Sequence, residues 1–281
     1  MSDRIVILEA GSVGLAASLS TLGFDVVPAA TLAVALVAAQ GADGVVTGHD
    51  VPAADVEALR RAGCPRGVFQ APEKHPLTDF RKYWLRGTAP RVLAFSGSAR
   101  KDSFNARLLS LAVERLKAAG VAVTVFDHAA HVLPLYNGDL EVGGALPDAV
   151  HAVQRVFFLH HGLLLAAPEY NGFPTPLLKN TLDWASRSSG GASGGSTFAG
   201  TVAGLVSASA GPGAGGRVRP LVRKLLGNLR MDVVEPELGV GRASGAFDDA
   251  GQLKDAEQTQ ALDAVVRAVV DGIAERSAAS E

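Results

Sequence analysis

Residues 91–120, RVLAFSGSARKDSFNARLLSLAVERLKAAG, decide the fold of the larger part of this chain. They begin with a short apolar run typical of a buried strand, continue into a polar loop, and end in a segment of helical periodicity. Leu108, Ala112 and Leu116 fall on one face of the predicted helix, and Ser103 is placed to cap its start. A strand joined to a helix in this way predicts a parallel β-α-β unit.

The same alternation of strand and helix continues along the rest of the chain. We predict five strands, near residues 91–97, 121–127, 162–167, 201–207 and 232–238. We predict helices near residues 103–119, 147–160, 175–187, 216–229 and 255–276. Such strands run parallel and form a doubly wound five-stranded α/β sheet, in which ligands bind beyond the carboxyl ends of the strands.

A smaller α/β block covers residues 1–70. Its apolar runs RIVILEA, FDVVPA and DGVVTG indicate strands, and the stretches between them indicate helices. Residues 71–90, rich in proline and charge, are predicted to link this block to the second block, residues 91–281. Because the linker also holds Phe80 and Trp84, which are too apolar for a free tether, we expect it to pack against other residues.

The composition excludes several classes of partner. Lys and Arg total 26 and Asp and Glu total 28, so the formal net charge of −2 gives no basic footprint for nucleic acid. A single cysteine, Cys64, excludes an internal disulfide and a cysteine-rich metal site. No apolar run approaches the ~20 residues that span a bilayer, and the start MSDRIVILEAGS indicates a strand rather than a signal peptide. We therefore expect a soluble, cytoplasmic protein without a membrane partner.

The loop SGSARKDSFN, residues 96–105, follows a strand and opens a helix, where free backbone N–H groups and the helix dipole favour an anion. Ser98 and Ser103 offer hydroxyls, Asn105 an amide, and Arg100 a charged fork suited to phosphate oxygens. It has neither the dinucleotide fingerprint G-x-G-x-x-G nor the G-K-[ST] of a nucleoside-triphosphate loop. An ordinary capped helix with a surface arginine explains the loop equally well at this point.

Two further loops follow the third and fourth predicted strands. In APEYNGFPTPLLKNTLDWASR, residues 167–187, Pro168 and Gly172 indicate a rigid turn whose backbone N–H groups can face a flavin. The alternative is a tight connection from strand to helix, and both descriptions can hold together. Glycines in SASAGPGAGGRV, residues 207–218, let a planar ligand or another subunit approach, although composition alone favours a mobile loop. The Gly/Ser run at 186–197 indicates a flexible loop.

Four motifs together resemble the NADPH-dependent FMN reductase family, which includes quinone, chromate and azo-dye reductases of flavodoxin-like fold. They are G-S-x-R-x-x-S-x-N at 97–105, P-E-Y-N-G at 168–172, L-K-N-x-x-D-W at 178–184 and the glycine-rich loop at 211–216. They occur in the family's order, and the resemblance covers roughly residues 90–272. It implies FMN as cofactor and NADPH or NADH as co-substrate.

The resemblance also implies roles for single residues. Those that would hold the FMN phosphate are Ser98, Arg100, Ser103 and Asn105. Those that would line the isoalloxazine ring are Pro168, Glu169, Tyr170, Asn171 and Gly172. Those that would lie near the flavin in the third loop, by a weaker match, are Ser207, Gly215 and Gly216. The helix with Lys179, Asn180, Asp183 and Trp184 resembles the part that packs across the family's dimer interface, which implies a homodimer or homotetramer.

The implied reaction passes hydride from a nicotinamide to the flavin and then electrons to a small acceptor, by a ping-pong scheme. The acceptor classes are quinones, free flavins, azo compounds and metal oxyanions. No catalytic side chain and no metal ligand is predicted, because the cofactor carries the chemistry. His128 and His131 have no nearby carboxylate cluster in the sequence, so we predict structural roles for them. The alternative function is an FMN-binding electron carrier or redox sensor.

The first block resembles the first half of a response-regulator receiver domain. In that alignment Gly48 stands at the position of the phosphorylated aspartate, and Ala10 and Gly11 replace the acidic pair that would hold magnesium. Asp50 is near but displaced, which makes it a poor substitute. We therefore expect a structural or oligomerisation role for this block rather than phosphorylation-dependent signalling.

Overall fold

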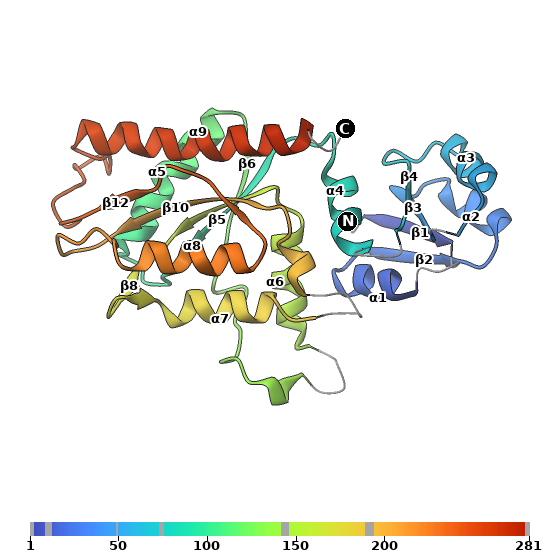
Figure 1. Cartoon of the computed structure of the whole chain (residues 1–281), viewed down its shortest axis with the longest axis horizontal. Coiled ribbons are helices and arrows are strands. Elements are labelled where there is room, and N and C mark those ends of the chain that lie inside the picture. Colours follow the sequence, from blue (N-terminus) through green and yellow to red (C-terminus); the bar gives the residue numbers. More distant parts are fainter. Residues whose placement is uncertain are drawn as a thin grey trace. The chain divides into compact units, whose positions relative to one another are not determined.

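The computed structural model of the chain describes residues 3–8, 13–48, 50–72, 76–141, 146–188 and 194–278. It divides into two compact units (Figure 1). The first unit consists of Met1–Arg86, Asn137–Arg155 and Arg187–Thr197. The second consists of Gly87–Tyr136, Val156–Ser186 and Phe198–Glu281. Two segments of the predicted second block therefore belong to the first unit.

The first unit holds a parallel sheet in the order β2-β1-β3-β4. Its strands are β1 (Arg4–Leu8), β2 (Asp25–Ala29), β3 (Gly44–Thr47) and β4 (Val68–Gln70). Its helices include α1 (Val13–Thr21), α2 (Leu32–Ala39), α3 (Ala53–Arg61) and α4 (Pro76–Leu85). The central strands β1 and β3 are apolar along almost their whole length because both faces of a parallel sheet are covered.

The predicted linker is a helix of the first unit. Phe80 and Trp84 of α4 are fully buried and stack on each other, with ring centroids 5.5 Å apart. Phe24 meets the Trp84 ring edge-on at 5.3 Å, and the Arg66 guanidinium lies 4.8 Å from the same ring. Burial of these aromatic rings anchors α4 in the core, since each ring removes a large apolar area from water. Within the predicted linker, residues 76–85 thus form a helix whose aromatic side chains are packed in this core.

The receiver-like features are only partly described by the structure. Gly48 comes directly after β3, and Asp50 is exposed two residues further on. The predicted substitutions at Ala10 and Gly11 lie outside the described residues, so the resemblance to a receiver remains a prediction. The centre of the Gly/Ser run, 189–193, also lies outside them, and Gly194–Thr197 forms a single short helical turn.

The second unit holds a parallel sheet in the order β11-β10-β7-β5-β6, with β12 also paired to β10. The strands are β5 (Arg91–Ser96), β6 (Ala122–Val125), β7 (Gly162–Ala166), β10 (Val202–Ala208), β11 (Asp232–Val233) and β12 (Leu238–Val240). The predicted fifth strand is thus two short strands, because the chain turns away from β10 between them. The order is doubly wound, with its switch point between β5 and β7.

Helices cover both faces of this sheet (Figure 1). They are α5 (Phe104–Ala118), α6 (Asp148–Phe158, of which only the end belongs to this unit), α7 (Pro176–Ala185), α8 (Val218–Asn228) and α9 (Ala256–Ala278). Helices α5 and α9 lie together on one face, and α7 and α8 lie on the other. A Cβ on Gly204 of β10 would lie 2.6 Å from Val269 of α9, so this glycine permits the close approach of helix and sheet.

Candidate functional site

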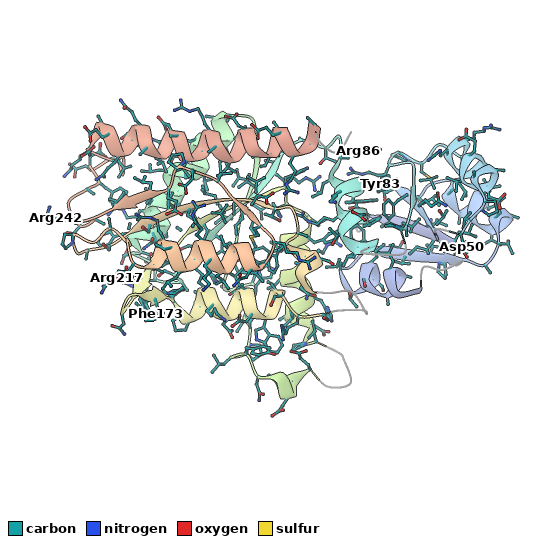
Figure 2. The ribbon with its side chains drawn as sticks, viewed as in Figure 1. Asp50, Tyr83, Arg86, Phe173, Arg217 and Arg242 are labelled. Atoms are coloured by element: carbon teal, nitrogen blue, oxygen red, sulfur yellow. The ribbon has the colours of Figure 1, made fainter. Side chains whose placement is uncertain are left out.

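Three loops meet at the carboxyl ends of β5, β7 and β10, which are neighbours in the sheet. We call residues 97–103 the first loop, 167–175 the second loop and 209–217 the third loop. Figure 2 shows Phe173 of the second loop and Arg217 of the third toward the same end of the unit. This is the switch-point edge where doubly wound sheets bind ligands.

The first loop has the geometry of an anion site. Ser103 is buried and caps α5, because its Oγ accepts a hydrogen bond from the Ala106 N–H at 3.4 Å. Ser98 Oγ accepts from the Arg100 N–H at 3.3 Å. Each hydroxyl accepts in these contacts, which leaves its hydrogen for another acceptor. The side chain of Arg100 is exposed beside them, close to the positive end of the helix dipole.

Asn105, predicted to hold the FMN phosphate, is bonded to the backbone within the chain. It is only 4% exposed, and its amide makes two hydrogen bonds to the backbone of Ala208 at the end of β10. Nδ2 donates to the carbonyl at 2.8 Å, and Oδ1 accepts from the N–H at 2.9 Å. The peptide group at the strand end needs these partners because it is buried. Asn105 therefore joins the start of α5 to the third loop, and its amide is turned toward β10.

The second loop contains a β-hairpin that the sequence analysis missed. Strands β8 (Glu169–Tyr170) and β9 (Phe173–Pro174) pair antiparallel across a turn at Asn171 and Gly172. Both turn residues have positive φ, 54° and 89°, as a two-residue type I′ turn requires. The dipeptide Asn-Gly between two aromatic residues is the feature of the sequence that predicts such a hairpin. The turn leaves the side chains of Tyr170 and Phe173 exposed.

The first and second loops are packed directly against each other. A Cβ on Gly97 would lie 2.7 Å from Pro168 Cδ and 3.0 Å from Leu178 Cδ1, so only glycine fits. Thr175 caps α7 by accepting from the Leu178 N–H, and its Oγ1 donates to the Gly97 carbonyl at 2.6 Å. Pro168 is therefore part of the wall between the loops.

An ion pair joins the second and third loops. Arg217 donates from Nε to Glu169 Oε1 at 2.8 Å, and Nη2 of the same guanidinium lies 2.5 Å from that oxygen. The Glu169 side chain is 13% exposed and that of Arg217 is 77% exposed. A Cβ on Gly172 would lie 3.8 Å from the guanidinium, so Arg217 runs alongside the hairpin turn. Glu169, predicted to line the flavin ring, points to the third loop.

The third loop is supported from below by Ser207. This side chain is fully buried, and its Oγ donates to the Ala214 carbonyl at 2.6 Å. Gly215 has a φ of 68°, and a Cβ there would lie 2.3 Å from Ser207 Oγ. Ser207 and Gly215 thus face each other inside the loop. Space lies open at Gly211 and Gly213, where an added Cβ meets nothing within 4 Å.

Comparison with known proteins decides the family. The model of a family described as NADPH-dependent FMN reductase matches residues 90–245. The chain belongs to the NADPH-dependent FMN reductase family. This confirms the family predicted from the four motifs, and the matched residues include all three loops of the site.

Two relatives illustrate how far the similarity of this family member extends. An NAD(P)H-dependent FMN reductase of Pseudomonas aeruginosa is 34% identical over 185 residues, which cover 63% of this chain and 95% of that protein. An NADPH:quinone oxidoreductase of Arabidopsis thaliana is 43% identical over 99 residues, or 34% of this chain. The chain spans about half the length of this plant relative and of matched proteins from potato and rice.

Solved structures confirm the fold of the second unit. FerB, a flavoenzyme NAD(P)H:acceptor oxidoreductase from Paracoccus denitrificans, matches with a TM-score of 0.58 at 24% identity. The match covers 67% of this chain and 99% of that protein. Together with the strand order, it confirms a parallel, flavodoxin-like doubly wound sheet.

The polar side chains of α7 make hydrogen bonds and an ion pair with residues of the same chain. Asn180 accepts from the Tyr136 N–H at 2.7 Å and donates to the Pro134 carbonyl at 2.9 Å. The buried Trp184 donates from Nε1 to the same carbonyl at 2.8 Å. Lys179 and Asp183 form the surface ion pair expected from their spacing, which is worth little to stability. Asn180 and Trp184 therefore position the segment that follows β6.

His128 supports the first loop, a contact that its sequence position did not reveal. Nε2 donates to the carbonyl of Ser96, the last residue of β5, at 2.7 Å. The imidazole packs against the rings of Phe95 and Phe126, with centroids 5.1 and 5.0 Å away. Burial lowers the pKa of His128, and the hydrogen bond to Ser96 and the charge of Asp127 oppose this shift in part.

Replacing His128 with glutamine is expected to weaken the pH dependence of stability. The lowered pKa means that the unfolded chain takes up the proton first as the pH falls. The stability from the neutral imidazole is therefore present above pH ~6.5 and is lost as the pH falls through the folded pKa. Urea unfolding at about pH 7.5 and 5.5 measures this, with His131→Gln as the control. If the free energy of unfolding fell equally from about pH 7.5 to about 5.5 in the wild type and in His128→Gln, the lowered pKa of His128 would not be the cause of the pH dependence.

The described residues lack two kinds of feature, a metal-binding cluster and a membrane-spanning helix. Among them, no group of three or more His, Cys, Asp or Glu side chains is arranged to hold a metal ion. No helix in the described part of the chain is both long and apolar enough to cross a membrane.

Proposed function

We propose that this chain is an FMN-containing oxidoreductase that transfers electrons from NADPH or NADH to a small acceptor, with quinones as the main class. The observation that carries the proposal is the meeting of an anion site, an exposed aromatic hairpin and a glycine-rich loop at one switch point. The names of the Arabidopsis and Pseudomonas relatives support quinone and FMN chemistry.

The first loop would hold the phosphate of FMN. Ser98 and Ser103 have hydroxyl hydrogens available there, and Arg100 is exposed at the start of α5. The backbone N–H groups of the first helical turn add donors that no side chain needs to supply. The structure fits a phosphate at this place, because an anion offsets the positive end of the helix.

The second and third loops would hold the flavin ring. We place its polar edge against backbone groups of the turn at Asn171 and Gly172 and against the open side of the third loop at Gly211 and Gly213. When bound, FMN supplies the hydride chemistry that the side chains lack. Tyr170 and Phe173 offer exposed rings on which a planar nicotinamide or quinone can stack.

The overall reaction balances with one proton from solvent. NAD(P)H loses two electrons and a proton as hydride, and a quinone gains two electrons and two protons to become a hydroquinone. The role of the protein is to place donor and acceptor in turn at the same site, which produces a ping-pong scheme. We place the protein in the cytoplasm, where reduced nicotinamides are available.

We also propose that the protein is a homodimer or homotetramer. Val132 and Leu135, in the segment that Asn180 and Trp184 position, are 72% and 79% exposed. Large apolar side chains exposed close together in sequence favour burial against another subunit. Light scattering on the purified protein tests this, and a monomer at micromolar concentration would contradict it.

Replacing Arg100 with alanine is expected to weaken FMN binding at least about tenfold, since a charge-assisted hydrogen bond is worth about 1.5–3 kcal/mol. The control is Arg107→Ala, because Arg107 lies on α5, after the first loop, and places its guanidinium 4.6 Å from the centroid of the Phe247 ring. Quenching of flavin fluorescence measures affinity, and thermal unfolding confirms that both variants are folded. Equal FMN affinity in the two variants would rule out the phosphate assignment.

Activity of the FMN-loaded protein tests the function itself. We expect steady oxidation of NADPH or NADH that depends on added benzoquinone and shows parallel double-reciprocal plots, as a ping-pong scheme requires. Reduction of bound flavin without multiple turnover would contradict the enzyme and favour an electron carrier.

A further inference from the structure

Arg219 lies in the first turn of α8 and reaches beneath the third loop. Its side chain is only 19% exposed. Nη1 donates to Ser207 Oγ at 2.7 Å and also to the Ala214 carbonyl. The same carbonyl accepts from Ser207 Oγ, so two donors converge on one oxygen of the loop.

The loop backbone needs this support. Ala214 and Gly215 follow each other with φ values of 52° and 68°. A left-handed conformation suits glycine but is unfavourable for alanine because its Cβ approaches the following carbonyl oxygen. The hydrogen bonds from Arg219 and Ser207 hold the carbonyl of the strained residue itself.

The neighbouring strand leaves room for the guanidinium. A Cβ on Gly239 of β12 would lie 2.0 Å from Arg219 Nη1 and 2.4 Å from the Ala214 oxygen. Any other residue at Gly239 would displace the guanidinium, the loop or both. The absence of a side chain at Gly239 therefore leaves the space that both Arg219 and the third loop occupy.

Glu237 balances the buried charge. It lies just before β12, and its two carboxylate oxygens accept from two arginines: Oε2 from Arg219 Nε at 3.1 Å and Oε1 from Arg223 Nε at 2.7 Å. Arg223 donates its other hydrogen bonds to the carbonyls of Val233 and Val234. Both arginines thus share one carboxylate, but Arg223 makes its other contacts with residues 233–235, at the end of β11 and just after it. Arg223 provides a matched control.

We propose that Arg219 is a positioning residue that fixes the glycine-rich third loop in the shape required to hold the flavin ring. The inference rests on the proposed function for the identity of the ligand. Its structural part, the support of the loop by Arg219, does not depend on a bound flavin. Loss of Arg219 should therefore free the loop even in the protein without cofactor.

The test compares Arg219→Gln, Arg219→Lys and Arg223→Gln in the full chain. In the cofactor-free protein, amide hydrogen exchange of residues 213–216 is expected to speed up about tenfold or more in Arg219→Gln, by the loss of two hydrogen bonds. Arg223→Gln should leave this exchange within about twofold of wild type. Arg219→Lys should restore part of the protection, because it keeps a donor and the charge.

Flavin binding provides the second readout. With FMN added, Arg219→Gln is expected to bind about tenfold or more weakly and to show a visible spectrum closer to that of free FMN, while Arg223→Gln resembles wild type. Equal exchange rates in Arg219→Gln and Arg223→Gln would overturn the proposal, whatever the affinity. Failure of the wild type to bind FMN would overturn the proposed function instead, and the exchange data would still decide the role of Arg219.

Discussion

Replacing Asn105 with leucine is expected to lower the free energy of unfolding of the second unit by about 2–5 kcal/mol. The buried N–H and carbonyl of Ala208 would both lose their partners, because Asn105 supplies an acceptor at 2.9 Å and a donor at 2.8 Å. Urea unfolding followed by Trp184 fluorescence measures the loss. A Trp84→Phe background removes the signal of the first unit.

The control for this prediction is Asn228→Leu. Asn228 is exposed at the end of α8, so the same change of side chain should alter stability by no more than about 0.5 kcal/mol. A similarly small effect in Asn105→Leu would show that the hydrogen bonds between Asn105 of α5 and Ala208 of β10 do not stabilise the second unit.

Replacing Gly97 with alanine is expected to separate the first and second loops. The new Cβ would lie 2.7 Å from Pro168 Cδ and 3.0 Å from Leu178 Cδ1, so the ring of Pro168 and the start of α7 must move. Overpacking of this kind costs about 1–3 kcal/mol. Because the displaced loops would hold opposite ends of FMN, we expect its affinity to fall about tenfold or more.

Gly227→Ala serves as the control for Gly97→Ala. Gly227 lies inside α8 with open space around its Cα, so alanine should be neutral or stabilise by up to about 1 kcal/mol. Flavin fluorescence titration and urea unfolding of both variants give the comparison. Unchanged affinity in Gly97→Ala would mean that the contact between the loops does not shape the site.

Much of the second unit was predictable because its sequence obeys local rules. The strand predicted near 91–97 is β5, Arg91–Ser96, and Leu108, Ala112 and Leu116 keep the helical period of α5. Ser103 and Thr175 cap their helices as their positions indicate. The loops after the strands could be placed at one edge of the sheet because parallel strands share a direction.

The contacts that shape the site could not be predicted, because they join residues far apart in sequence. Asn105 and Ala208 are separated by 103 positions, and nothing near either residue indicates the pairing. Ser207, near the end of β10, and Arg219, in the first turn of α8, meet beneath a glycine-rich loop whose composition alone indicates mobility. The hydrogen bonds by which Asn105 and Ser207 hold the loops are therefore not indicated by the sequence, and the roles of both residues toward the ligand remain predictions.

The first unit shows a different limit of sequence analysis. Proline at positions 72 and 76 and the charges between them suggested a linker. The burial of Phe80 and Trp84 against Phe24 makes the segment part of a core instead. Aromatic residues in a segment without clear periodicity were the signal that this region packs.

A visible absorption titration with FMN, followed by NADPH and separately NADH without oxygen, shows whether this site binds flavin and lets a nicotinamide reduce it. We expect FMN to bind with a perturbed spectrum, its absorption to bleach within seconds of adding a nicotinamide, and a quinone to restore it. Flavin that does not bind, or that binds and stays oxidised with both nicotinamides, would contradict the assignment of this site as that of a reductase.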